Sequence, residues 1–177
     1  MKLRILPYCL ALFIYLLPGV HEKAQAQKFS DDEIKTAFIY NFLKFTKWEQ
    51  TPNPIKIGIV GNGNLAQTII ANLGNQKVGT STLDFLFVSD STQLKNYDVI
   101  IYINERNGIT PELIKHYTSG KPVLSIGVTE DFVQKGGIIS IVKNQANQKK
   151  IFVNLKNLQA SKITISSKLL SLAQIIK

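Results

Sequence analysis

The residues with the clearest chemical potential are glycines that follow a short apolar stretch. The run GNGNLA at residues 61–66 comes directly after Ile55–Val60 and opens a helix-like segment. It matches G-x-G-x-x-A, the phosphate-binding fingerprint of dinucleotide-binding folds. In that fingerprint the glycines let the backbone approach a pyrophosphate at the N-terminus of a helix. Gly61, Gly63 and Asn64 are therefore weak candidates for binding a small ligand.

The rest of the dinucleotide fingerprint is not met. It requires an acidic residue at the carboxyl end of the second strand, where the carboxylate binds a ribose hydroxyl. Asp84 stands near the start of the predicted second strand, and Asp90 stands past its end. The simpler interpretation is a tight turn between a strand and a helix, and we predict no cofactor.

Other catalytic patterns are missing from the sequence. It contains neither a G-x-S-x-G nucleophile elbow nor an H-E-x-x-H metal motif, and His116 is interpreted as a solvated side chain. Asp98 and Glu130 are two carboxylates that could meet in space, although their spacing gives no support for it. Gly136-Gly137 is interpreted as a site of positive φ or close packing, with a binding loop as the alternative. We predict no catalytic or metal site and no enzymatic activity.

The first 26 residues have the pattern of a secretory signal peptide. Basic residues at positions 2 and 4 precede an apolar run at Tyr8–Leu17, and the tripeptide AQA at residues 24–26 has the form of a cleavage site. The apolar run is too short for a membrane span, which needs about 20 residues. We expect cleavage after Ala26 and export to the periplasm, which leaves residues 27–177 as a single domain.

Composition narrows the function of that domain. Cleavage removes the only cysteine, Cys9, so the exported domain has no disulfide to hold it together. It also lowers the formal net charge from +9 to +7, because the leader carries three basic residues and one acidic residue. Among the remaining cations only Arg106 is an arginine, the residue that nucleic-acid readers use for bidentate contacts. We interpret the lysines as a solvated basic surface, with no nucleic acid as partner.

Apolar runs alternate with helix-like segments through the middle of the chain. The predicted strands are Ile55–Val60, Leu83–Val88, Val99–Ile103 and Val123–Ile126, and the predicted helices are Asn64–Leu73, Thr92–Asn96, Pro111–Thr118 and Glu130–Lys135. This alternation predicts an α/β fold with a mainly parallel sheet and helices on both faces. Ile138–Val142 and Lys150–Leu155, joined by a polar loop at Asn144–Gln148, then predict an antiparallel hairpin.

A long aromatic-rich helix is predicted at Ser30–Trp48. Ser30 and Glu33 form a capping box at its start. The predicted buried face comprises Ile34, Ala37, Phe38, Phe42, Phe45 and Trp48. Asn41 lies within this face and is interpreted as a buried amide that bonds to the backbone.

The last predicted helix closes the domain and starts at about Ser166. Its buried face comprises Leu169, Leu172, Ala173 and Ile176. Leu170 and Ile175 lie off that face, and they are our candidates for a partner or dimer interface.

Several segments together resemble the YfiR family. They are IKTAFIYNFLKFTKW from residue 34, IKIGIVG from 55, PVLSIGVTEDFVQKGGIISIV from 122, KKIFVNL from 149 and ITISSKLLSLAQ from 163. The most specific matches are Tyr40-Asn41-Phe42 with Trp48, Gly136-Gly137, Asn154-Leu155 and Ser166–Leu170. We interpret Tyr40, Asn41, Phe42, Trp48, Gly136, Gly137 and Asn154 as residues that anchor the fold.

The resemblance implies a non-enzymatic periplasmic regulator that forms a homodimer. The best-known member of this family binds the periplasmic domain of a membrane diguanylate cyclase and holds it inactive, and an outer-membrane lipoprotein can sequester that repressor. Other relatives accompany membrane sensor kinases. The output is then cyclic di-GMP signalling or phosphorylation. The alternative is a periplasmic small-molecule sensor that uses the Gly61–Gly63 turn.

Overall fold

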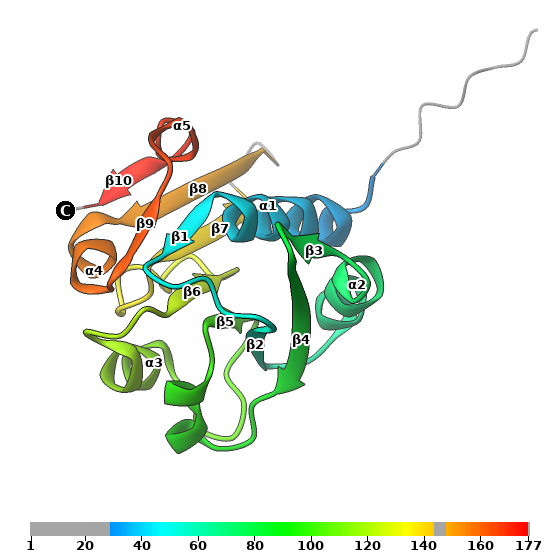
Figure 1. The fold of residues 1–177 in the computed structure, drawn as a ribbon, viewed down its shortest axis with the longest axis horizontal. Helices are drawn as coiled ribbons and strands as arrows, with labels where there is room; N and C mark the ends of the chain where they lie inside the picture. Colours follow the sequence, from blue (N-terminus) through cyan, green and yellow to red (C-terminus); the bar gives the residue numbers. More distant parts are fainter. Residues whose placement is uncertain (1–28, 144–147, 177) are drawn as a thin grey trace, which may run out of the picture.

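The computed structural model describes residues 29–143 and 148–176. The predicted signal peptide and most of the predicted hairpin loop therefore lie outside the described residues. Within the described ranges, no helix is both long and apolar enough to cross a bilayer. The centre of this part of the chain is an eight-stranded mixed sheet with helices on both faces (Figure 1). The predicted fold class is thus confirmed.

The sheet has a regular order. Its strands are β2 (Ile55–Val60), β3 (Lys77–Val78), β4 (Ser81–Phe87), β5 (Val99–Tyr102), β6 (Leu124–Gly127), β7 (Ile139–Lys143), β8 (Lys149–Asn154) and β10 (Gln174–Ile176). They lie side by side in the order β10-β8-β7-β6-β5-β2-β4-β3. Strands β4, β2, β5, β6 and β7 are parallel, while β8 runs antiparallel to β7 and pairs in parallel with β10. The parallel part has the doubly wound order whose topological switch lies between β2 and β5.

The central strands are apolar because both of their faces are covered. All four residues of β5 are buried, and Val99 is paired with Ile57 of β2 on one side and with Leu124 of β6 on the other. A strand buried on both faces reads as an unbroken apolar run rather than an alternating one. This is why the sequence pattern locates the strand centres closely.

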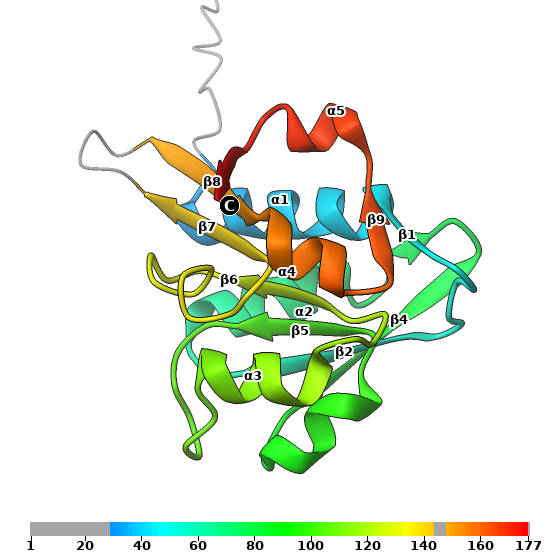
Figure 2. The same cartoon turned by 90° about the vertical axis from the view of Figure 1, so that its left-hand side faces the viewer.

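Helices cover the two faces of the sheet in separate groups. They are α1 (Asp31–Phe45), α2 (Asn64–Leu73), the 3₁₀ helix η2 (Ser91–Asn96), α3 (Pro111–Thr118), α4 (Leu155–Ala160) and α5 (Ser167–Leu170). Helices α1 and α2 pack on one face over a core that includes Phe42 and Ile69, and η2 and α3 pack on the other over Leu94, Ile114 and Phe132 (Figure 2). The bounds of α2, α3 and β2 are the predicted ones.

Helix α1 ends earlier than predicted. Its capping box is present, since the Ser30 hydroxyl accepts from the Glu33 backbone N–H at 3.2 Å and the Ser30 N–H donates to the Glu33 carboxylate at 2.7 Å. The predicted last turn, Thr46–Trp48, is instead strand β1, which pairs antiparallel with β9 (Ile163–Ile165). Its burial alternates residue by residue, which is the period of a strand and not of a helix.

The buried face of α1 also differs from the predicted one. Ile39 and Leu43 are fully buried, whereas Ala37 and Phe45 are exposed. Apolar residues surround most of this helix, so their spacing alone leaves its rotation open. Contacts with the sheet and with α2 select the side that carries Ile39 and Leu43.

The C-terminal region was predicted incorrectly in part. Helix α5 has only four residues, after which the chain extends into β10 along β8. Leu169 is buried as predicted, but Leu172 is 68% exposed. The predicted helix at Glu130–Lys135 is a series of turns. The start of α5 near Ser166 is as predicted, and the error lies in where the helix ends, because residues 174–176 pair with β8 instead.

Candidate functional site

The Gly61 turn lies at the topological switch of the sheet. Gly61 follows β2 with φ +109°, and Gly63 caps α2 with φ +114° and no side-chain hydrogen bond. The Asn104 amide, just past β5, donates to the Asn62 carbonyl at 3.1 Å and so joins the two loops of the switch. A Cβ atom at position 61 would lie 2.8 Å from the Asn104 backbone nitrogen. The glycine is thus required by the close approach of Asn104, which occupies the crevice where ligands bind in related folds.

Neither acidic candidate completes a nucleotide site at this turn. Asp84 lies within β4, opposite Lys56 of β2, and not at the carboxyl end of the strand. Asp90 caps η2, where its carboxylate accepts the Thr92 backbone N–H at 2.8 Å, and this hydrogen bond lowers the pKa of Asp90. The geometry agrees with a tight strand-to-helix turn.

The other titratable candidates are far from one another. Asp98 precedes β5 and Glu130 follows β6, so the two carboxylates stand at opposite edges of parallel strands. Burial raises the pKa of Asp98, and the Lys56 backbone N–H that donates to it at 2.8 Å acts in the opposite direction. His116 is exposed on α3 and has its ring edge against Tyr117. No group of three or more potential metal ligands gathers anywhere in the described ranges.

Three of the motif residues connect α1 and β1 to distant parts of the fold. The Tyr40 hydroxyl donates to the Lys77 carbonyl at 2.9 Å, which ties α1 to β3. Phe42 is fully buried in the core under α1. The Trp48 indole N–H donates to the Pro122 carbonyl at 2.9 Å, close to the start of β6.

The double glycine surrounds an aromatic side chain. Phe132 is fully buried and stacks on Tyr102 with ring centroids 5.2 Å apart. A Cβ atom at Gly137 would lie 2.0 Å from the Phe132 ring, and one at Gly127 would lie 2.2 Å from it. Gly136 has φ +123°, and a Cβ atom there would lie 2.7 Å from the Lys115 side chain. Both parts of the first interpretation, positive φ and close packing, are present.

Asn154 holds the segment before the double glycine in place. Its amide donates to the Val133 carbonyl at 3.0 Å, and its side-chain oxygen accepts the Asn157 backbone N–H at 2.9 Å. The first bond reaches back to the turns that carry Phe132, and the second starts α4. One side chain therefore joins the end of β8 to the turns that precede β7.

Asn41 has a different environment from the predicted one. It is half-exposed and lines a groove of about 560 Å³ between α1 and α2, together with the apolar side chains of Phe29, Phe38 and Leu73. Within the described residues its amide has no hydrogen-bond partner, so the interpretation as a buried amide bonded to the backbone is wrong. The groove itself was not predicted, because it depends on the rotation of α1.

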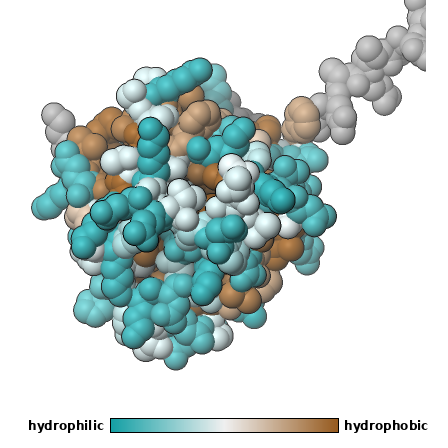
Figure 3. Space-filling view, viewed as in Figure 1, coloured by the Kyte–Doolittle hydropathy of each residue, from teal (hydrophilic) through white to brown (hydrophobic). Residues whose placement is uncertain are grey.

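The two interface candidates lie on the C-terminal arm, defined here as residues 166–176. Ile175 is 42% exposed on β10, the outermost strand on its side of the sheet. Leu170 is half-buried and packs against the core. The sequence analysis missed Leu172, since its position in the expected helix placed it in the core. In the orientation of Figure 3, apolar side chains are visible at the upper left, where Figure 1 places α5 and β10.

The described residues thus form an α/β fold with a mainly parallel sheet, and they gather no group of three or more potential metal ligands. A family model described as YfiR/HmsC-like matches residues 32–174. The chain therefore belongs to the YfiR/HmsC-like family, which confirms the resemblance inferred from its motifs. Proteins of this family are regulators of signalling in the periplasm.

Two solved structures share the fold at low sequence identity. One is a conserved domain protein from Vibrio cholerae O1 biovar El Tor, with 16% identity, a TM-score of 0.53, and coverage of 85% of this chain and 61% of that one. The other is an ABC domain in complex with L-Trp from Streptococcus pneumoniae, with 17% identity, a TM-score of 0.54, and coverage of 82% and 62%. This chain thus spans about three-fifths of each relative. A comparison with curated proteins finds no match.

Proposed function

We propose that this protein is an exported, non-enzymatic repressor that binds the periplasmic domain of an inner-membrane signalling protein. The receptor is a diguanylate cyclase or a sensor kinase, and binding holds it inactive. The observation that carries the proposal is the family match over residues 32–174. The predicted signal peptide, a homodimeric state and a sequestering outer-membrane lipoprotein belong to the same proposal.

Repression of this kind is a shift in population. A bound protein stabilises the inactive receptor only by the difference between its affinities for the inactive and active states. A shift from 1:99 to 99:1 requires about a 10⁴-fold difference in affinity. The receptor-binding surface must therefore contact a part of the receptor that changes between the two states.

The C-terminal arm is our proposed binding surface. β10 pairs with β8 on one side, and its other edge is the margin of the sheet, where backbone N–H and C=O groups are available to an added strand. Leu172 and Ile175 add exposed apolar side chains beside that edge. Leu170 supports the arm from the core side, so it is a poor position for a test by substitution.

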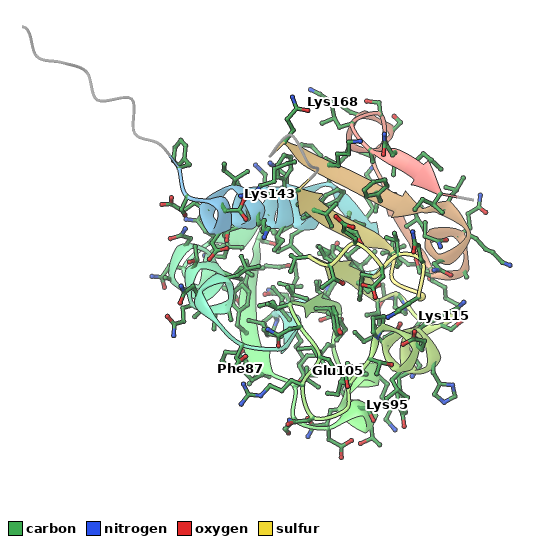
Figure 4. The ribbon with its side chains drawn as sticks, turned by 180° about the vertical axis from the view of Figure 1, so that it is seen from behind. Phe87, Lys95, Glu105, Lys115, Lys143 and Lys168 are labelled. Carbon is green, nitrogen blue, oxygen red and sulfur yellow. The ribbon has the colours of Figure 1, made fainter. Side chains whose placement is uncertain are left out.

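In-cell crosslinking tests the repressor proposal. Tagged protein crosslinked in the cell envelope should recover one inner-membrane protein that has a periplasmic domain and a cyclase or kinase domain. The double variant Leu172→Lys with Ile175→Lys should lose that receptor and keep a cooperative melt. Phe87→Lys is the matched control, because Phe87 is 56% exposed at the end of β4, at the opposite side of the sheet (Figure 4). Recovery of the receptor with the double variant would place the surface elsewhere.

A small-molecule sensor is the second candidate. The groove between α1 and α2 has the volume of typical ligand pockets, which are about 300–1,000 Å³. It is mainly apolar and offers the unpaired amide of Asn41 to orient a ligand. The Gly61 turn is less suited, since Asn104 packs against it. L-Trp, the ligand of the Streptococcus structure, is a reasonable first probe.

A thermal shift experiment tests the sensor candidate. A ligand that binds only the folded state adds RT ln(1 + [L]/Kd) to the free energy of unfolding and so raises the melting temperature. L-Trp should raise it for the wild type and not for Asn41→Leu, while Asn72→Leu, at the rim of the groove, keeps a partial response. An equal shift in all three proteins would exclude the groove as the binding site.

A further inference from the structure

A second cavity lies at the amino edge of the sheet, between α3 and α4. Its volume is about 220 Å³, and it is enclosed by residues from α3, α4, the starts of β6 and β7, and Gly136. In Figure 2, α4 lies above α3 in the view. It is distinct from both the C-terminal arm and the groove beside α1.

The cavity is lined by cations without counter-charges. Lys115 of α3 and Lys156 of α4 approach it from two sides, and none of its described lining residues is acidic. In the described part of the chain, neither ammonium group has an ion-pair or hydrogen-bond partner. Both lysines are exposed, and an anion in the cavity would be attracted by each of them.

The floor of the cavity adds a hydrogen-bond donor. Ser125 is 2% exposed and lines the cavity, and its Oγ accepts the Ile138 backbone N–H at 3.0 Å. Its hydroxyl hydrogen has no acceptor among the described residues. A buried hydroxyl donor without an acceptor is costly unless a water or ligand oxygen accepts from it.

Two other hydroxyls of the cavity are already committed as donors. Thr118 Oγ1 donates to the Ile114 carbonyl at 2.7 Å, and Ser161 Oγ donates to the Leu158 carbonyl at 2.7 Å. The groups left to meet a ligand include two ammonium groups and the hydroxyls of Ser125 and Ser119, all of which can donate. Such a set matches the oxygens of an anion and not a cation.

The local chain is built to keep Lys115 at this place. Gly136 lies under the Lys115 side chain, where a Cβ atom would come within 2.8 Å of Lys115 Cβ and within 2.7 Å of its Cδ. The absence of a side chain at position 136 lets the lysine stem lie flat over the turn. The double glycine thus shapes one wall of the cavity as well as packing around Phe132.

We propose that this cavity binds a small dianion with phosphate or carboxylate oxygens, held by Lys115 and Lys156 from either side and by the Ser125 hydroxyl at the floor. The volume is below the range of pockets for drug-sized ligands, so the ligand has only a few heavy atoms beyond its charged groups. This inference does not depend on the proposed receptor. It gives the domain a site at which a small periplasmic anion binds between α3 and α4.

The experiment uses the purified protein with inorganic phosphate as the first probe and succinate as the second. Sodium chloride at matched ionic strength controls for screening. We expect one of the two anions, at up to about 20 mM, to give a saturable rise in melting temperature. The same anion should shift the backbone amide NMR signals of Gly136 and Asn157. Binding of phosphate alone identifies a phosphate site, and binding of succinate identifies a carboxylate site.

Variants decide whether the signal comes from this cavity. Lys115→Gln and Lys156→Gln should each weaken binding about tenfold, since each removes a charge-assisted hydrogen bond. Lys95→Gln removes the same charge from η2, outside the cavity, and should leave the dissociation constant within about twofold (Figure 4). Lys156 is exposed, so its substitution tests binding without risk to folding. The proposal is overturned if neither anion binds, or if all three variants bind equally.

Discussion

Substitution of Gly137 by alanine tests how the double glycine works. The new Cβ atom would lie 2.0 Å from Cε1 and 2.2 Å from Cδ1 of Phe132, whereas carbon atoms in contact normally lie about 3.5–4.0 Å apart. Phe132 cannot yield easily, because it is fully buried, stacks on Tyr102 and also lies against Gly127. We expect Gly137→Ala to lower the free energy of unfolding by about 2–3 kcal/mol, the cost of overpacking a core.

The assay is urea unfolding followed by the fluorescence of Trp48, the only tryptophan, which is buried in the folded state. A double-mutant cycle with Phe132→Ala isolates the steric contact. That variant alone should cost about 3–5 kcal/mol through the cavity it creates. In its background, Gly137→Ala should cost less than about 0.5 kcal/mol, because the obstructing ring is gone.

Gly120→Ala is the control for backbone effects. Gly120 has φ +72° and nothing within 4 Å of a new Cβ atom, so its substitution measures the conformational cost alone, about 1 kcal/mol. If Gly137→Ala is equally costly with and without the Phe132 ring, steric contact with that ring is not the reason for the glycine.

Three further predictions concern hydrogen bonds that position the elements. Ser30→Ala removes the acceptor for the Glu33 N–H and should lower the free energy of unfolding in urea by about 1 kcal/mol. The control Ser91→Ala should change it by less than about 0.5 kcal/mol. Equal effects of the two substitutions would argue against the capping box. Asn154→Ala loses two hydrogen bonds and should cost about 2 kcal/mol. Asn154→Asp keeps the acceptor for Asn157 and should fall between that variant and the wild type. Burial raises the pKa of Asp98, so the folded state binds the proton of this carboxyl group more tightly than the unfolded state does. The free energy of unfolding is therefore lowered as the pH rises from about 3.8 through the folded-state pKa. The free energy of unfolding of Asp98→Asn, relative to that of the wild type, should therefore rise with pH across that interval. Parallel pH profiles of the two proteins would contradict the raised pKa of Asp98.

Local signals predicted the elements that have strong local determinants. Helix α3 begins at Pro111 after the Thr110 cap, and α2 begins after two glycines with positive φ, so both were placed with correct bounds. Strand β2 is apolar between a proline and a glycine. In each case the residues that decide the boundary are adjacent to it in sequence.

The elements that sequence analysis missed depend on distant partners. Strand β1 forms because Thr46 pairs with Ile165, and β10 forms because Gln174 pairs with Phe152. Nothing within a few residues of either strand encodes that register, and both stretches carry helix-compatible apolar spacing. The tertiary pairing overrides the local period.

For the candidate sites too, the sequence predicted positions along the chain but not the contacts between distant residues. The Gly61 turn was placed after a strand correctly, but its contact with Asn104 joins residues from two separate βα loops. Exposure of Ile175 follows the expectation, although the residue lies on a strand and not on a helix. The lysine cavity had no signal in the sequence, because Lys115, Lys156 and Ser125 share no motif or spacing.

The pairing of β1 with β9 has a consequence for how the chain acquires its structure. Trp48, near the start of the domain, lies opposite Ile163, near its end, and this contact closes one of the longest loops in the fold. Long-range contacts of this kind form late, since loop closure must precede the gain from packing. A chain that stops before Ile163 would leave β1 without its partner strand and Trp48 without the residue opposite it. We therefore expect the domain to complete its folding only after nearly all of its chain has been synthesised.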